Sequence, residues 1–180
     1  VEMDVAAAKF ILGFKETGIP LAGEELVRRE LLSDLGLDLL FGSSSDLFRE
    51  LYEKQLVHDG LWSGYDTLGG VAYAMVGGDT SSPDEFPGRL LDGIESHLDE
   101  ALSRDNFERK KRQFIGDFVR RFSSLEFIAH GFTTYLFREF DLFSLIDLIN
   151  GLEREMLEEH LRSLLDPDRH SIFKIIPRSS

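Results

Sequence analysis

The spacing of apolar residues changes along the chain, and this change limits the folds that the sequence can adopt. Over residues 5–15 the large apolar side chains fall on alternate positions, which predicts a strand with one buried face: Phe10, Leu12 and Phe14. After Pro20 they recur at every third or fourth position until Gly42, which predicts a helix: Leu26, Val27, Leu31, Leu32, Leu35 and Leu39. A chain with both periods packs helices against a sheet.

A second pair of strands is predicted around the Gly69-Gly70 turn. The strands cover residues 62–67 and 71–76, and Gly77-Gly78 is expected to end the second one. In that strand the bulky Val71, Tyr73 and Met75 alternate with the smaller Ala72, Ala74 and Val76. We therefore expect a helix to lie against the face that carries the small side chains.

Capping residues and chain breakers divide the rest of the sequence into short helices and one closing strand. Ser43–Asp46 offers N-caps for a helix that contains Leu47, Phe48, Leu51 and Leu56, and the next helices are expected to start at Ser82-Pro83-Asp84-Glu85, near Phe107, at the capping box Ser123-x-x-Glu126 and at Asp141. Gly151 precedes a helical segment over 152–165, and residues 172–176 follow Pro167 as a strand. This order predicts an α+β domain with helices on one face of a sheet.

Composition excludes several classes of protein. The chain has 180 residues, the size of one domain, and its formal net charge of −13 repels nucleic acid. No apolar run approaches the ~20 residues that cross a membrane. Cysteine is absent, which fits a cytoplasmic protein. The 15 phenylalanines predict a large core, an apolar face for a partner, or both.

The histidines do not form a recognisable metal site. There are five: His58, His97, His130, His160 and His170. His97 and Glu100 match part of an inverted His-x-x-Glu-His zinc motif, but Ala101 fills the second ligand position. His130 lies four residues after Glu126, a spacing that also fits an ordinary contact on one helix face. We therefore expect no metal ligands and no catalytic residues in this chain.

Other motifs of catalysis or binding are incomplete. Gly42-Ser43-Ser44-Ser45 lacks the spacing of a nucleophile elbow, and the glycine pairs lack the lysine of a phosphate loop. A basic cluster, Arg109-Lys110-Lys111-Arg112 with Arg120 and Arg121, allows two interpretations. It is either a solvated helix face or a docking surface for an acidic partner.

Three segments resemble zinc peptidases of the insulinase (pitrilysin) family. Residues 47–57 are similar to the family segment Leu-Phe-x-x-Leu-Arg-Glu-Lys-x-Gly-Leu-x-Tyr. Residues 123–129 resemble Asn-Ser-x-Glu-Phe-Ile-Ala of a bacterial branch, and residues 74–80 resemble the same branch. The resemblance covers essentially the whole chain. It implies a domain like those of mitochondrial processing peptidase, with a mixed, largely antiparallel sheet and helices on one face.

The resemblance implies a domain that works with others. Family members pair homologous domains of this size, and the N-terminal domain carries the zinc motif. This chain lacks that motif, so it resembles the metal-free C-terminal domain, excised from a longer two-domain chain, with zinc expected in the preceding domain. An arginine and a tyrosine of many such domains contact the substrate, but their positions here are Tyr52 and Asp59. This departure is typical of two-subunit relatives, in which a second peptidase-like subunit supplies the pair.

Three functions remain open from the sequence. The first is the non-catalytic half of a zinc metallopeptidase, which forms the wall of a chamber for a peptide substrate and the interface with a partner domain or a second subunit, so that the protein is a dimer. The second is an inactive interaction or scaffold domain. The third is an unrelated α+β hydrolase, which no nucleophile motif supports. A zinc motif in the preceding domain favours the first function over the second.

Overall fold

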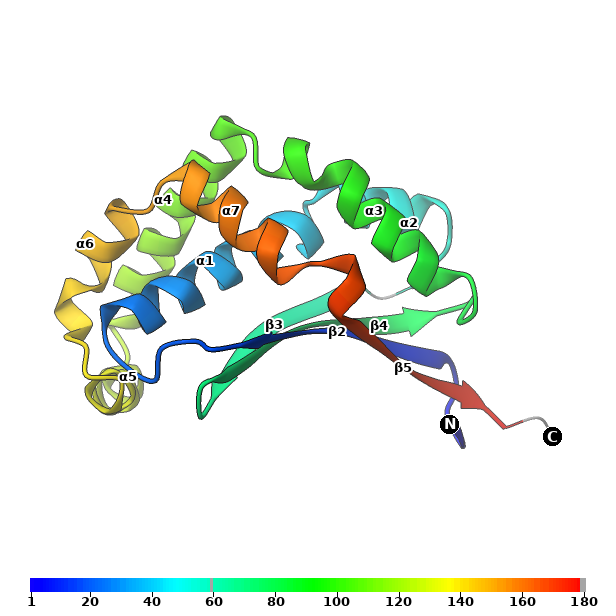
Figure 1. Ribbon diagram of the computed structural model, residues 1–180, viewed down its shortest axis with the longest axis horizontal. Coiled ribbons are helices and arrows are strands. Elements are labelled where there is room, and N and C mark those ends of the chain that lie inside the picture. Colours follow the sequence, from blue (N-terminus) through cyan, green and yellow to red (C-terminus); the bar gives the residue numbers. More distant parts are fainter. Residues whose placement is uncertain (59, 179–180) are drawn as a thin grey trace.

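A mixed sheet forms one layer of the molecule, and the helices form the other (Figure 1). The computed structural model describes residues 1–58 and 60–178. The strands in these residues are β1 (Glu2–Met3), β2 (Ala8–Thr17), β3 (Leu61–Leu68), β4 (Val71–Thr80) and β5 (His170–Pro177), in the order β1-β5-β2-β4-β3. Only the pairing of β1 with β5 is parallel, and the other neighbours are antiparallel. The expected α+β class and largely antiparallel sheet are confirmed.

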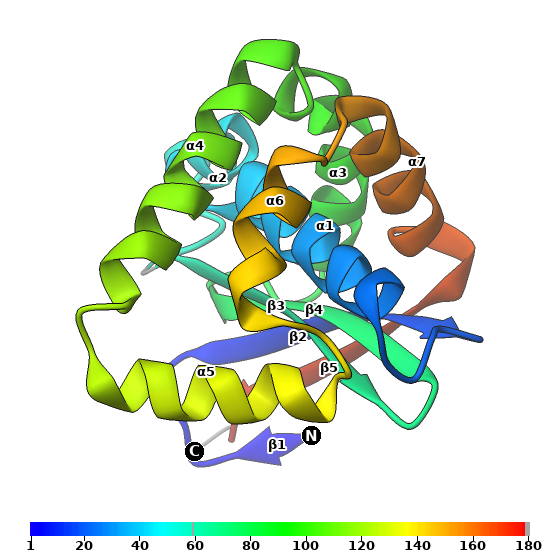
Figure 2. The same ribbon diagram turned by 90° about the vertical axis from the view of Figure 1, so that its left-hand side faces the viewer.

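The helices all lie on the same side of the sheet, apart from α5 at its end (Figures 1 and 2). Their bounds are α1 (Glu24–Phe41), α2 (Asp46–Glu53), α3 (Phe86–Ala101), α4 (Arg104–Arg121), α5 (Leu125–Phe137), α6 (Leu145–Asn150) and α7 (Arg154–Leu164). Short 3-10 turns at Leu142–Ser144 and Pro167–Arg169 precede α6 and β5. The predicted caps Ser45 and Asp141 are confirmed, because their side chains accept from the backbone N–H of Phe48 and Phe143.

Helix α1 lies in the centre of the helical layer, between the sheet and α7. On the sheet, the small side chains Ala72, Ala74 and Val76 of β4 are fully buried, as the alternation predicts. Phe10, Leu12 and Phe14 of β2 form one core with Ala74 and Val76, whereas Ala72 packs with Ile19 and Leu26. On the other side of α1, a β carbon placed at Gly36 would collide with the Leu161 side chain of α7. A glycine at position 36 therefore allows the two helices to approach closely.

Several predicted element ends are wrong by a few residues. Helix α3 begins at Phe86, because Ser82–Glu85 forms a turn in which the Ser82 carbonyl accepts from the N–H groups of Glu85 and Phe86. Ser124 caps α5 in place of Ser123, α4 begins at Arg104 before Phe107, and α2 ends at Glu53 before Leu56. Strand β4 continues through Gly77-Gly78 to Thr80, and the short β1 was not anticipated.

Substitution of Gly36 by alanine should destabilise the domain, although alanine favours helix formation. The added methyl group forces α1 and α7 apart, and overpacking of this kind costs about 1–3 kcal/mol. Gly116 is the matched control, because a β carbon at this position in α4 meets no atom within 4 Å. Gly116→Ala should stabilise the domain by about 0.5–1 kcal/mol. Urea denaturation measures both changes, and a stabilised Gly36→Ala variant would contradict the packing described.

Candidate functional site

The incomplete zinc motif lies on α3, where His97 has protein partners. Its Nδ1 donates to the Gly93 carbonyl oxygen at 3.0 Å, and its Nε2 lies 3.1 Å from Glu50 Oε2 of α2. The histidine therefore joins α3 to α2. Among residues 1–58 and 60–178, no three His, Cys, Asp or Glu side chains are grouped so that they could hold a metal ion.

His160 is a buried structural histidine. Its ring nitrogen Nε2 lies 2.7 Å from the Ser33 hydroxyl of α1, and burial lowers the pKa of the imidazole to about 4. The ring is therefore uncharged at neutral pH and fills the space between α7 and α1. His58 and His130 lie separately on the surface, and His170 Nδ1 donates to the Pro167 carbonyl.

The resemblance predicts a substrate-contacting pair at positions 52 and 59, where this chain has Tyr52 and Asp59. Tyr52 lies on the exposed side of α2, with 55% of its surface accessible, and its ring lies 6.0 Å from that of Phe48. Tyr52 lines a surface hollow of about 440 Å³ together with Gln55 and His58. Asp59 lies outside the described residues. Arg49, one turn before Tyr52, pairs with Asp46 of its own helix.

The basic cluster on α4 is not a single exposed surface. Lys110 is only 6% exposed, and its Nζ donates to Asp38 Oδ2 at 2.6 Å and to Gln113 Oε1 at 3.1 Å. Lys111 donates to the carbonyl oxygens of Asn150 and Leu152, so it ties α4 to the segment before α7. The solvated-face interpretation is therefore wrong for these two lysines, which hold helices together.

The face of the sheet opposite the helices is uncovered (Figure 1), and its middle rows are apolar, whereas the exposed Lys15 and Asp66 flank Tyr73 toward one end. A row of residues crosses four strands, in which Trp62 of β3 pairs with Gly77, Gly77 with Ile11, and Ile11 with Phe173. A β carbon at Gly77 would fall on the Trp62 indole, so the ring lies across the glycine. Trp62 and Phe173 are nearly half exposed.

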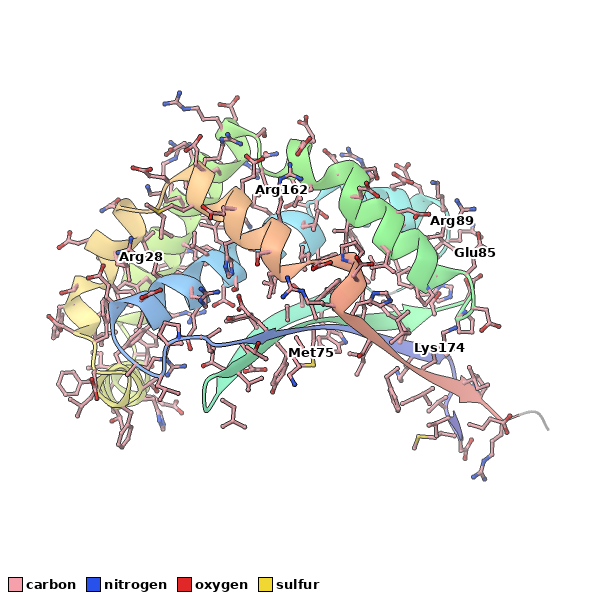
Figure 3. All side chains as sticks on the ribbon, in the orientation of Figure 1. Arg28, Met75, Glu85, Arg89, Arg162 and Lys174 are labelled. Carbon is pink, nitrogen blue, oxygen red and sulfur yellow. The ribbon has the colours of Figure 1, made fainter. Side chains whose placement is uncertain are left out.

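The neighbouring rows extend this uncovered face. Met75 and Tyr73 of β4 project from the same side as Ile11, and Figure 3 shows Met75 pointing away from the helices. At one border Lys9 Nζ lies 2.7 Å from Asp79 Oδ1. An apolar centre with a charged border is typical of protein interfaces. We call the side chains of this face the open sheet face: Ile11, Trp62, Tyr73, Met75 and Phe173.

A second apolar surface lies on α5, at the end of the sheet (Figure 2). Of the α5 residues only Gly131 is buried. Leu125 and Phe137 are more than four-fifths exposed, and Phe132 and Leu136 are at least half exposed. The expected large core is confirmed, because six phenylalanines are buried in it, and others are exposed on α5 and the open sheet face.

Comparisons with known proteins agree with the resemblance. No family model matches the sequence. The chain is 30% identical over 182 residues to YmfH, an uncharacterized zinc protease of Bacillus subtilis, in an alignment that covers 99% of the chain and 42% of YmfH. The chain therefore spans about two-fifths of the length of this relative.

Solved structures share the fold. An M16-like peptidase from Alicyclobacillus acidocaldarius matches with a TM-score of 0.89 and 21% identity, over 98% of this chain and 42% of that one. The peptidase M16 inactive domain from Pseudomonas fluorescens matches with a TM-score of 0.77 and 18% identity, over 100% of this chain and 43% of that one. The resemblance to insulinase-type peptidase domains is confirmed.

Removal of the buried lysine should destabilise the fold. In Lys110→Met the Asp38 carboxylate loses its cation partner, and we expect a loss of about 1–3 kcal/mol in the free energy of unfolding. The control is Arg109→Met, one residue earlier, where the side chain is exposed and the change should stay within about 0.5 kcal/mol. Equal effects of the two substitutions in urea denaturation would show that Lys110 has no structural role.

Burial of His160 predicts a loss of stability in acid. Because its pKa is about 4 in the fold and 6.5 when exposed, the unfolded chain binds the proton first as the pH falls. The contribution of the uncharged His160 ring to the free energy of unfolding is complete above pH 6.5. It declines by roughly 2–3 kcal/mol as the pH falls to 4. In His160→Gln this decline should be absent, whatever the stability at pH 7. Parallel pH profiles of unfolding for the two proteins would exclude His160 as the cause.

Proposed function

We propose that this chain, which has the fold of an M16-like peptidase domain, is the non-catalytic half of a zinc metallopeptidase. The observation that carries the proposal is the open sheet face, an apolar surface on a domain whose described residues contain no metal-binding group. Large exposed apolar surfaces are typical of sites that another protein covers. The occupant is the homologous zinc-bearing domain of the same polypeptide, since the 42% coverage of YmfH leaves room for a second domain in such a protein.

The chemistry of peptide hydrolysis allows this division between two domains. Zinc acts as a Lewis acid and activates water, and these tasks need metal ligands and a base on one wall only. The opposite wall positions the peptide by shape and by backbone hydrogen bonds. Strand β3 suits this role, because it ends the strand order and its outer backbone groups pair with no strand in the described part of the chain.

The hollow beside Tyr52 and the apolar surface of α5 complete the proposed assembly. The hollow is lined by residues that directly precede β3 in the sequence, and a peptide held along β3 is proposed to extend into it. A second peptidase-like subunit covers α5, which makes the protein a dimer.

The absence of cysteine from the sequence fits action in the cytoplasm. In the described part of the chain, no helix has the length and apolarity needed to cross a membrane.

The chain alone should bind far less than one zinc ion and cleave no peptides. The longer polypeptide that includes the zinc-bearing domain should contain zinc and hydrolyse unfolded peptides. Metal analysis and a fluorogenic peptide assay on both proteins test this division. A stoichiometric zinc in the isolated chain would refute the proposal, and a longer polypeptide without zinc or activity would instead establish the scaffold alternative.

A charge on the open sheet face tests the interface separately. Met75→Lys places an ammonium group at the centre of this face, where docking would bury it without a partner. Binding to the separately produced zinc-bearing domain should weaken at least about tenfold. The control Glu95→Lys introduces a lysine on the exposed side of α3 and should leave binding unchanged. Calorimetry measures both affinities, and equal affinities would exclude the open sheet face as the interface.

A further inference from the structure

A groove of about 400 Å³ lies between α1, α4, α5 and α6, away from the open sheet face. Figure 2 shows these four helices, with α5 below α4 and α6 and with α1 behind them. The groove borders α5, which the proposed second subunit covers, but the proposed peptidase role assigns it no ligand. Its walls are apolar and aromatic, and its charged residues are mostly carboxylates. Together these two features indicate what the groove binds.

The walls of the groove are apolar and aromatic. Phe118 of α4 and the α5 residues Phe127 and Tyr135 form one side, and Leu31, Leu145 and Ile149 complete it. Aromatic faces attract cations, and aliphatic stems pack well on such walls. In this groove the Phe127 ring already has such a partner, because the Arg121 guanidinium lies 5.8 Å from its centre, which leaves Phe118 and Tyr135 as the aromatic wall for a ligand.

Three carboxylates line the groove, Asp34 and Asp38 of α1 and Asp117 of α4, and within residues 1–58 and 60–178 only one of them has no cation partner. Asp38 pairs with Lys110, Asp117 of α4 pairs with Arg120, and Glu30, next to the groove, pairs with Arg138. Asp34 has no ion pair within 4 Å in the described part of the chain. Its charge is therefore not balanced inside the protein.

The surroundings of Asp34 oppose its ionisation. Asp34 keeps an exposed surface at the rim of the groove, but partial desolvation and repulsion from Glu30, Asp66 and Asp38 raise the pKa of its carboxyl group to about 6. The remaining charged or titratable groups of the groove are Asp117 and Arg121 of α4 and Tyr135 of α5. A cation between the aromatic walls and Asp34 would remove this penalty, because it supplies the missing opposite charge.

We propose that this groove binds the side chain of an arginine that a segment of another protein presents. The guanidinium group pairs with Asp34, its plane stacks on the aromatic wall, and its aliphatic stem fills the apolar part of the groove. The chemistry fits arginine better than a metal ion, because the carboxylates beside Asp34 are already paired with lysine and arginine side chains.

A pair of peptides tests the proposal on the chain itself. One carries a single arginine between alanines, and the other carries citrulline, which has nearly the same shape but no charge. We expect the arginine peptide to shift backbone NMR signals of α1 and α5 saturably, with a dissociation constant below about 10 mM. The citrulline peptide should bind at least tenfold more weakly. Equal binding of both peptides, or no saturable shift, would overturn the proposal.

Two further measurements place the binding at Asp34. Asp34→Asn should weaken binding of the arginine peptide at least tenfold, whereas Asp92→Asn, with the same change of charge on the exposed side of α3, should not. In the unsubstituted chain, the arginine peptide should lower the pKa of the Asp34 carboxyl group, followed by carbon NMR. Unchanged binding in Asp34→Asn, or an unchanged pKa, would place the peptide elsewhere and refute the proposal.

Discussion

The packing of α1 on the sheet is the contact on which the rest of the structure depends. Helix α1 approaches the sheet most closely at β3, and the small side chains Ala72, Ala74 and Val76 of the neighbouring β4 are fully buried beneath the helical layer. Helices α2, α3, α4 and α7 then pack around α1, and Gly36 allows α7 to come close. Because the helical layer is built around a helix on one face, the other face of the sheet stays uncovered. The surface available to a partner is thus a consequence of the way the core is made.

Much of this core could be predicted from the sequence, because it depends on periodic patterns. The alternation in β2 and β4 identified the buried face of each strand, and the helical spacing after Pro20 identified α1. Such patterns arise because burial repeats with the geometry of the backbone. The element order and the one-sided helical layer followed from them.

The features that prediction missed depend on contacts between residues distant in the sequence. Strand β4 continues through Gly77-Gly78, because both glycines pair with β2 and β3, and the Trp62 indole lies across Gly77. In the sequence, Lys110 belongs to a basic run that resembles an exposed helix face. In the structure it donates to Asp38, 72 residues earlier, and is buried in the helical layer. The groove at Asp34 is formed by four helices, so no local motif could reveal it. The resemblance to peptidases singled out the position of Tyr52. Its part in contacting a substrate stays a prediction.

Trp62 gives the uncovered face an optical property of its own. It is the single tryptophan of the chain, it lies across Gly77, and nearly half of its surface is exposed on the open sheet face. Indole emission depends on contact with water. Because Trp62 is the single tryptophan, all tryptophan fluorescence of the chain comes from this one surface. The chain therefore carries a built-in fluorophore that distinguishes a covered sheet from a bare one, without labels and in real time.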